Sequence, residues 1–125
     1  MTDKPITDPV VWTEIPVTDL EAARKFYNTV LATQLRDMEM GPNKTLIFPA
    51  DDPETAVAGH LYEGRPAAPG TGSTIHLALR DAVENGMERV EQAGGKVVSD
   101  VIEIPAGRFA YCLDPDGNSI GLFSR

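Results

Sequence analysis

Hydrophobic and polar positions change their spacing twice within the first third of the chain. Residues 10–17 have the pattern of a β-strand, and apolar residues between Leu20 and Leu31 then recur at helical spacing. Thr18 is predicted as the helix N-cap, with Glu21 as the partner of a capping box. Three extended segments are predicted to follow, at about residues 34–40, 44–49 and 55–63.

The second half of the chain repeats this order. Residues 73–79 have the pattern of a strand, and the helix that follows is predicted to begin at Asp81, with Glu84 as its box partner. Gly94 and Gly95 are predicted to end this helix, because glycine adopts a left-handed cap without a Cβ clash. Three further extended segments are predicted at about residues 96–104, 108–113 and 119–123.

This repetition predicts an α+β fold with two tandem βαβββ modules that form a curved mixed sheet around a cavity. The stretch 64–72 is rich in proline and glycine and lies between the two halves. A single domain over residues 1–125 is therefore expected, with module one at 10–63, a linker at 64–72 and module two at 73–125.

Composition narrows the range of partners. The chain has 125 residues and a net charge of −8, so an acidic surface would repel phosphate backbones, and nucleic-acid binding is not expected. No apolar run approaches the roughly 20 residues that cross a bilayer, so no membrane span is expected. The single cysteine, Cys112, lies in an apolar run, which predicts a buried thiol and is consistent with a reducing, cytoplasmic location.

Three stretches carry a resemblance to a known family. They are Glu14–Leu20, Gln92–Val97 and Arg108–Leu122, and they resemble the vicinal oxygen chelate superfamily of glyoxalases, bleomycin- and fosfomycin-resistance proteins and extradiol dioxygenases. The resemblance implies a cavity enclosed by two cupped modules. It also implies a homodimer, formed either side by side or by exchange of modules.

The resemblance also implies metal ligands on the first and last strand of each module, usually His, Glu or Gln. These positions match Trp12, His60, Thr74 and Gly121, of which only His60 carries a good ligand. The usual metal site is therefore predicted to be missing, and no cofactor is expected.

Strand alternation identifies further polar candidates. Trp12 and Glu14 are predicted on the strand face away from the helix, and Thr74 and His76 on the corresponding face of the second module. Glu14 and His76 are thus the predicted catalytic pair. The predicted cavity-lining residues are Trp12, His60, Thr74 and Tyr111.

Three interpretations of these groups remain open. Glu14, His60 and His76 could form a displaced site for a divalent metal ion, as in a lyase or dioxygenase. They could instead support acid–base chemistry without a metal. They could also line the pocket of a protein that only binds a small molecule, for example one that sequesters a drug. The leading hypothesis is a small-molecule-binding protein without the usual metal site, and whether it is an enzyme stays open.

Overall fold

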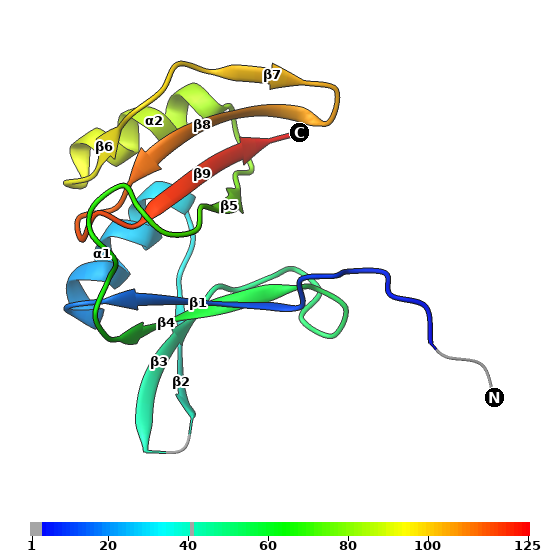
Figure 1. Ribbon diagram of the computed structural model, residues 1–125, viewed down its shortest axis with the longest axis vertical. Helices are drawn as coiled ribbons and strands as arrows, with labels where there is room; N and C mark the ends of the chain where they lie inside the picture. Colours follow the sequence, from blue (N-terminus) through cyan, green and yellow to red (C-terminus); the bar gives the residue numbers. More distant parts are fainter. Residues whose placement is uncertain (1–3, 41) are drawn as a thin grey trace.

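The computed structural model describes residues 4–40 and 42–125, and these fold into two mixed sheets and two helices (Figure 1). The first sheet has the strand order β1-β4-β3-β2. Its elements are β1 (Trp12–Val17), α1 (Leu20–Leu31), β2 (Arg36–Met40), β3 (Asn43–Ile47) and β4 (Ala58–Glu63). The second sheet has the order β5-β9-β8-β6, with β7 also paired to β8. Its elements are β5 (Ile75–Ala78), α2 (Val83–Gln92), β6 (Lys96–Val97), β7 (Ile102–Ile104), β8 (Gly107–Leu113) and β9 (Ser119–Ser124).

The predicted α+β fold of two βαβββ modules is confirmed. In each half the first strand pairs in parallel with the last, β1 with β4 and β5 with β9, and the remaining pairings are antiparallel. The strands form two separate sheets rather than one continuous sheet. The strand expected at 96–104 is divided into β6 and β7. The reason is local, because the Ser99 hydroxyl accepts the Tyr111 backbone N–H at 2.8 Å, where a strand carbonyl would otherwise do so.

Both predicted helix caps are wrong by one residue. Asp19, not Thr18, caps α1, since its carboxylate accepts from the backbone N–H groups of the first turn at 2.9 and 3.1 Å. Thr18 instead donates its hydroxyl to Asp116 of the second module at 2.6 Å. The second helix has Ala82 at its N-cap without a side-chain bond, because Asp81 is engaged by Arg89 at 2.8 and 3.0 Å.

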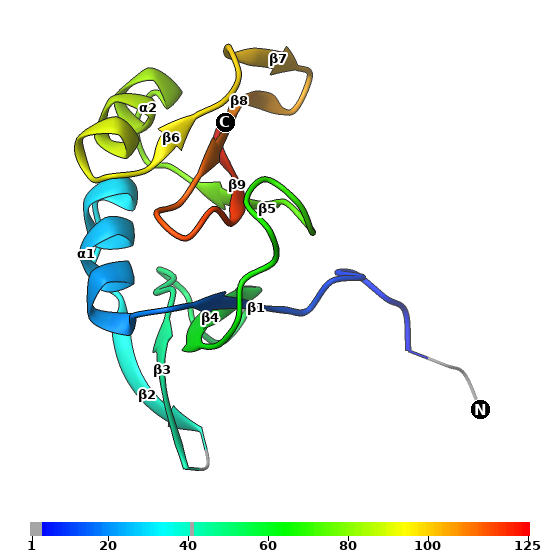
Figure 2. The ribbon, with the colours of Figure 1, turned by 60° about the vertical axis from the view of Figure 1, so that its left-hand side comes forward.

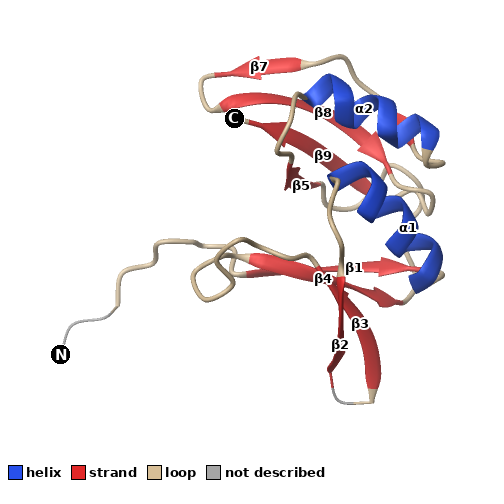
Figure 3. Cartoon of the chain, turned by 180° about the vertical axis from the view of Figure 1, so that it is seen from behind, coloured by secondary structure: helices blue, strands red, loops and turns tan. Residues whose placement is uncertain are grey.

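The two modules share one hydrophobic core. Helices α1 and α2 pack against each other along one side of the molecule (Figures 2 and 3), with α1 against the first sheet and α2 against the second. A single cluster of buried side chains joins both halves; among its members are Ile15, Val17, Phe26, Val30, Leu61, Val83, Val90, Ile120 and Leu122. Cys112 belongs to this cluster, as predicted from its apolar neighbours. Within the described residues, no helix has the length and apolar character needed to span a bilayer.

One side of each sheet packs on the shared core, and its other side therefore faces away from that core. Side chains that alternate with the core residues lie on the far side of their sheet, away from the helices. We call these sides the first outer face and the second outer face. The first carries Trp12, Glu14, Met38, His60 and Tyr62, and the second carries His76, Ile102, Phe109, Tyr111 and Phe123.

A turn between β8 and β9 fastens the second module onto the first. The Gly117 N–H donates to the Asp114 carbonyl at 2.9 Å, and Gly117 adopts a φ of +86°, as the last residue of a tight turn often does. Asn118 then reaches across the module boundary and donates its side-chain amide to the Pro16 carbonyl at 2.8 Å. The turn therefore contributes to the fixed placement of the two sheets.

Candidate functional site

Three of the predicted site residues form a row on the first outer face. Strands β1 and β4 are in register so that Glu14 lies opposite His60. The Trp12 indole N–H donates to Nδ1 of His60 at 2.8 Å. On the other side of the ring, Nε2 of His60 lies 3.2 Å from Oε1 of Glu14. We call this arrangement the Trp12–His60–Glu14 row.

Exposure changes sharply along the row. His60 is only 4% exposed, whereas the Glu14 side chain is 66% exposed and presents its carboxylate to solvent. A buried imidazole is costly unless its polar atoms have partners. Here Nδ1 accepts the Trp12 N–H, and Nε2 faces the Glu14 carboxylate. The row thus holds an accessible carboxylate beside a buried histidine.

The second outer face carries an aromatic cluster around His76. The His76 ring centroid lies 5.1 Å from that of Phe109, 5.8 Å from that of Tyr111 and 6.2 Å from that of Phe123. Gly121 makes room for this ring, since a Cβ there would collide with His76 Nδ1. The predicted residue Thr74 lies at the edge, where its hydroxyl is hydrogen-bonded to Ser119 at 2.6 Å.

A single chain does not bring these two groups together. Glu14 and His60 lie on the first outer face and His76 on the second, and the side of each sheet that carries the core residues lies between them. In the part of the chain that the structure describes, no three His, Cys, Asp or Glu side chains lie close enough to hold a metal ion. Strand alternation placed Glu14 and His76 correctly on the faces away from the helices, but it carries no information on how the modules are oriented.

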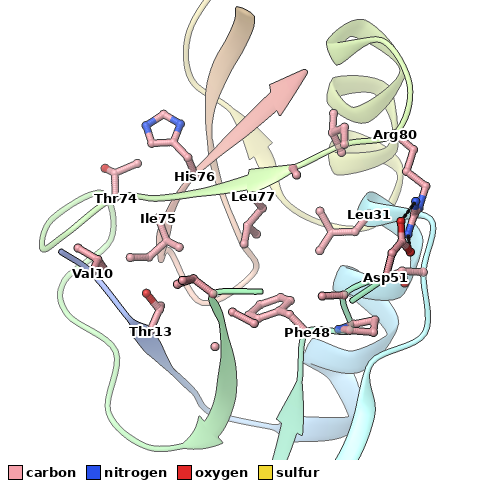
Figure 4. Close-up of a pocket in the computed structure, with 18 residues that line it drawn as sticks. Val10, Thr13, Leu31, Phe48, Asp51, Thr74, Ile75, His76, Leu77 and Arg80 are labelled. Carbon is pink, nitrogen blue, oxygen red and sulfur yellow. Dashed lines mark hydrogen bonds and ion pairs between the residues drawn. The ribbon is translucent and has the colours of Figure 1, made fainter. Parts of the chain in front are cut away.

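The structure also contains a pocket whose lining includes Thr74, one of the predicted cavity-lining residues, and His76. It has a volume of about 910 Å³ and lies between the free edge of β5 and the first module. Its apolar walls are Leu31 and Phe48 from the first module and Ile75 and Leu77 from β5, while the His76 ring points away from it (Figure 4). The residues Ile75 and Leu77 were recognisable only as an apolar strand face, which fits ordinary core packing equally well.

One end of this pocket is closed by an ion pair between the modules. Arg80 donates two hydrogen bonds to the Asp51 carboxylate at 2.7 and 2.9 Å. These hydrogen bonds lower the pKa of Asp51, even though the side chain is exposed. The pairing of Asp51 with Arg80 could not be predicted from the sequence, because the two residues lie in different modules.

A family model described as the Glyoxalase/Bleomycin resistance protein/Dioxygenase superfamily matches residues 10–122. The chain belongs to this superfamily. The relative YwbC of Bacillus subtilis, a protein named as uncharacterized, is 31% identical over 90% of this chain and 94% of its own. The Mycobacterium bovis protein CFP32, whose name includes the word glyoxylase, is 28% identical over 89% of this chain. The chain spans only 42% of CFP32.

Solved structures of the same superfamily share the fold. A glyoxalase/bleomycin resistance protein from Albidiferax ferrireducens has a TM-score of 0.70 and 22% identity, covering 92% of this chain and 97% of its own. The fosfomycin resistance protein FosX from Mesorhizobium loti has a TM-score of 0.63 and 20% identity, covering 97% of this chain and 94% of its own. At these identities the likeness concerns the fold alone.

The residues at the superfamily's metal positions do not fit a metal ion in this chain. Trp12 offers an N–H, which can only donate, and that N–H is directed at His60. The Thr74 hydroxyl is hydrogen-bonded to Ser119, and Gly121 has no side chain. His60 is the one suitable ligand of the four, and metal sites in proteins use three or four.

Proposed function

We propose that this chain binds a small organic molecule without a metal ion, in a cavity that two copies of the chain build together. Superfamily membership supports the small-molecule ligand. The observation that carries the proposal is the accessible Glu14 carboxylate, whose Oε1 lies 3.2 Å from Nε2 of the buried His60 ring. An exposed carboxylate without such support would be an ordinary surface group.

The two outer faces define the chemistry of the ligand. The Glu14 carboxylate accepts hydrogen bonds, so the ligand should present an N–H, an O–H or a positive charge. The aromatic cluster around His76 would pack against an apolar or aromatic body. An anionic compound would be disfavoured, because the chain itself carries a net charge of −8. The ligand is therefore neutral or cationic and partly apolar.

A second copy is needed because one chain cannot appose its own outer faces. Both faces expose large apolar side chains: Trp12 is 41% exposed and Met38 46% on the first, and Ile104 is 42% exposed beside the second. A twofold axis would set the first outer face of each chain against the second outer face of its partner. This arrangement corresponds to the predicted homodimer with exchanged modules, and it creates two identical cavities.

Proton transfer is a second candidate function. An accessible carboxylate beside a histidine ring is placed to act as a general base, and Glu14 has this arrangement. Glu14 would take a proton from the bound molecule and return it to another atom of the same molecule, so the reaction would be an isomerisation. Without turnover, the same site would serve sequestration. Positions 12, 74 and 121 offer no metal ligands, so a metal-dependent lyase or dioxygenase would need Glu14 and His60 of one copy to meet the His76 ring of a second copy.

Native mass spectrometry of untagged protein tests the proposal directly. We expect a dimer that retains a small organic compound in the presence of a chelator, together with less than stoichiometric metal in elemental analysis. Glu14→Gln should release the compound. The control Glu39→Gln should retain it, because Glu39 lies on the same sheet but not on the first outer face. A metal ion present once per chain and lost in His60→Gln would contradict the proposal.

A matched variant separates the outer faces from the pocket between the modules. Leu77→Trp would fill that pocket and leave the Trp12–His60–Glu14 row unchanged. Retention of the compound by Leu77→Trp supports binding at the outer faces. If Leu77→Trp loses the compound and Glu14→Gln retains it, the compound binds in the pocket between the modules and not at the outer faces. A cytoplasmic location, finally, remains a prediction from the single buried cysteine.

A further inference from the structure

We infer that Trp12 is a positioning residue, which fixes the ring tautomer of His60 so that this histidine donates to Glu14 and cannot serve as a metal ligand. The inference deepens the proposed function, since it concerns the same site. It assigns a task to the residue that stands at one of the superfamily's metal positions. Its test uses ligand-free protein, so its failure can be told apart from a failure of the binding proposal.

The first step follows from the donor inventory of the side chains. An indole has one N–H, which donates and never accepts. The Trp12 N–H lies 2.8 Å from Nδ1 of His60, so Nδ1 must offer its lone pair. A neutral imidazole then carries its proton on Nε2. The bond to Trp12 thus selects one of the two tautomers.

The second step concerns the carboxylate. With its proton on Nε2, His60 turns an N–H toward Oε1 of Glu14, which lies 3.2 Å away. A charged acceptor favours an N–H on the nitrogen that faces it. The His60 ring is 4% exposed, so it gives the exposed Glu14 side chain a buried partner. Trp12 therefore acts on Glu14 through His60.

The third step explains the loss of metal binding at the one remaining ligand. A histidine that binds a metal through Nε2 carries its proton on Nδ1 and donates it to an acceptor. In this chain Nδ1 faces a donor, so a proton there would set two N–H groups against each other. Binding a metal through Nε2 would require the Trp12 bond to break.

Simple core packing does not account for this arrangement. Trp12 is 41% exposed, so burial of its ring is not what holds it in place. The indole is also tilted by 47° against the His60 ring, with its N–H directed at the nitrogen rather than its face stacked on the ring. The specific feature is therefore the hydrogen bond, which phenylalanine at position 12 would lack.

Nuclear magnetic resonance of the ring nitrogens tests the inference, and the chain is well suited because it has only two histidines. The spectra are recorded on ¹⁵N-labelled protein at about pH 8, above the range in which histidine usually titrates. His76→Gln identifies the signals of His60. In the wild type we expect His60 in a single tautomer with its proton on Nε2.

Two variants show which neighbour selects this tautomer. Trp12→Phe should give a mixture of both tautomers, whereas Glu14→Ala should keep the proton on Nε2. Unchanged backbone amide signals of the two helices, which lie away from both outer faces, show that each variant is folded. If Trp12→Phe does not fold, the spectra of the wild type and of Glu14→Ala are sufficient to test the inference. A proton on Nδ1 in the wild type, or a mixture in Glu14→Ala, overturns the inference.

A metal titration provides a second readout. Ni²⁺ should perturb the His60 signals of Trp12→Phe at a concentration roughly tenfold lower than in the wild type, which is the usual size of such an effect on metal affinity. The double variant Trp12→Phe, Glu14→Ala should lose this gain. Equal Ni²⁺ responses in wild type and Trp12→Phe would overturn the claim that Trp12 keeps His60 from binding metal.

Discussion

The phenol of Tyr27 donates a hydrogen bond of 2.6 Å to Oδ2 of Asp114 across the boundary between the two modules. Both side chains are buried. Asp114 also accepts from the backbone N–H groups of Asp116 and Asn118 at 3.0 and 2.9 Å, so its carboxylate is well supplied with donors. The contact joins α1 to the turn before β9 and holds the modules in the orientation that keeps the outer faces apart.

Removal of the phenol should therefore weaken the whole fold. Tyr27→Phe leaves a buried carboxylate with one donor fewer, and we expect a loss of about 1.5–3 kcal/mol in the free energy of unfolding, as for other hydrogen bonds to charged groups. Urea denaturation measures this loss. Tyr62→Phe on the first outer face is the control and should change stability much less. Equal losses in both variants would contradict a special role for Tyr27.

The same residue predicts how stability depends on alkaline pH. Burial, reinforced by the charge of Asp114, raises the pKa of Tyr27 well above its ordinary value of 10.0. Above about pH 10 the unfolded chain loses this proton while the folded chain keeps it, so the free energy of unfolding falls as the pH rises. Thermal melting between about pH 8 and 11 should show a shallower fall for Tyr27→Phe. The same slope in both proteins would contradict the prediction.

Cys112 should be nearly inert in the folded protein. Burial, with a smaller contribution from Glu91, raises the pKa of its thiol from 9.0 to about 11. Two pH units correspond to a roughly hundredfold smaller thiolate fraction. A chromogenic disulfide reagent should therefore react slowly with native protein and quickly in denaturant. Fast reaction of the native protein would show that Cys112 is accessible.

Gly121 should be required for the position of His76. Gly121→Ala introduces a Cβ that would collide with the His76 ring, so the ring should leave the cluster formed with Phe109 and Tyr111. Its proton resonances should then lose the shifts that the neighbouring rings impose. A double-mutant cycle with His76→Ala provides the control, because Gly121→Ala should cost less stability once the imidazole is gone. Additive costs would show that the two residues do not interact.

Local patterns in the sequence predicted most of the fold. Both helices, the duplicated order of elements and the turn around Gly117 follow from periodicity and turn chemistry, which act over a few residues. The helix caps were misplaced because Thr18 and Asp81 are attractive caps whose side chains are instead used by distant partners, Asp116 and Arg89. Competition between local and long-range hydrogen bonds is not visible in a sequence.

The candidate site could be predicted only in part. Alternation placed Glu14 and His76 on the correct strand faces, and the parallel pairing of β1 with β4 brought Glu14 to His60. The hydrogen bond from Trp12 to His60 depends on side-chain rotamers, which the sequence does not specify. The separation of His76 from Glu14 depends on how the two modules pack. That packing follows from contacts far apart in the chain, such as Tyr27 with Asp114.

Chemical crosslinking between two chains tests the shared cavity most directly. One variant carries Glu14→Cys on the first outer face and another carries Tyr111→Cys on the second. The two are co-expressed and treated with a short bis-maleimide, and wild-type protein controls for reaction at the buried Cys112. We predict a crosslinked dimer from the mixture and none from either variant alone. A crosslink within single, monomeric chains that carry both substitutions would contradict the account.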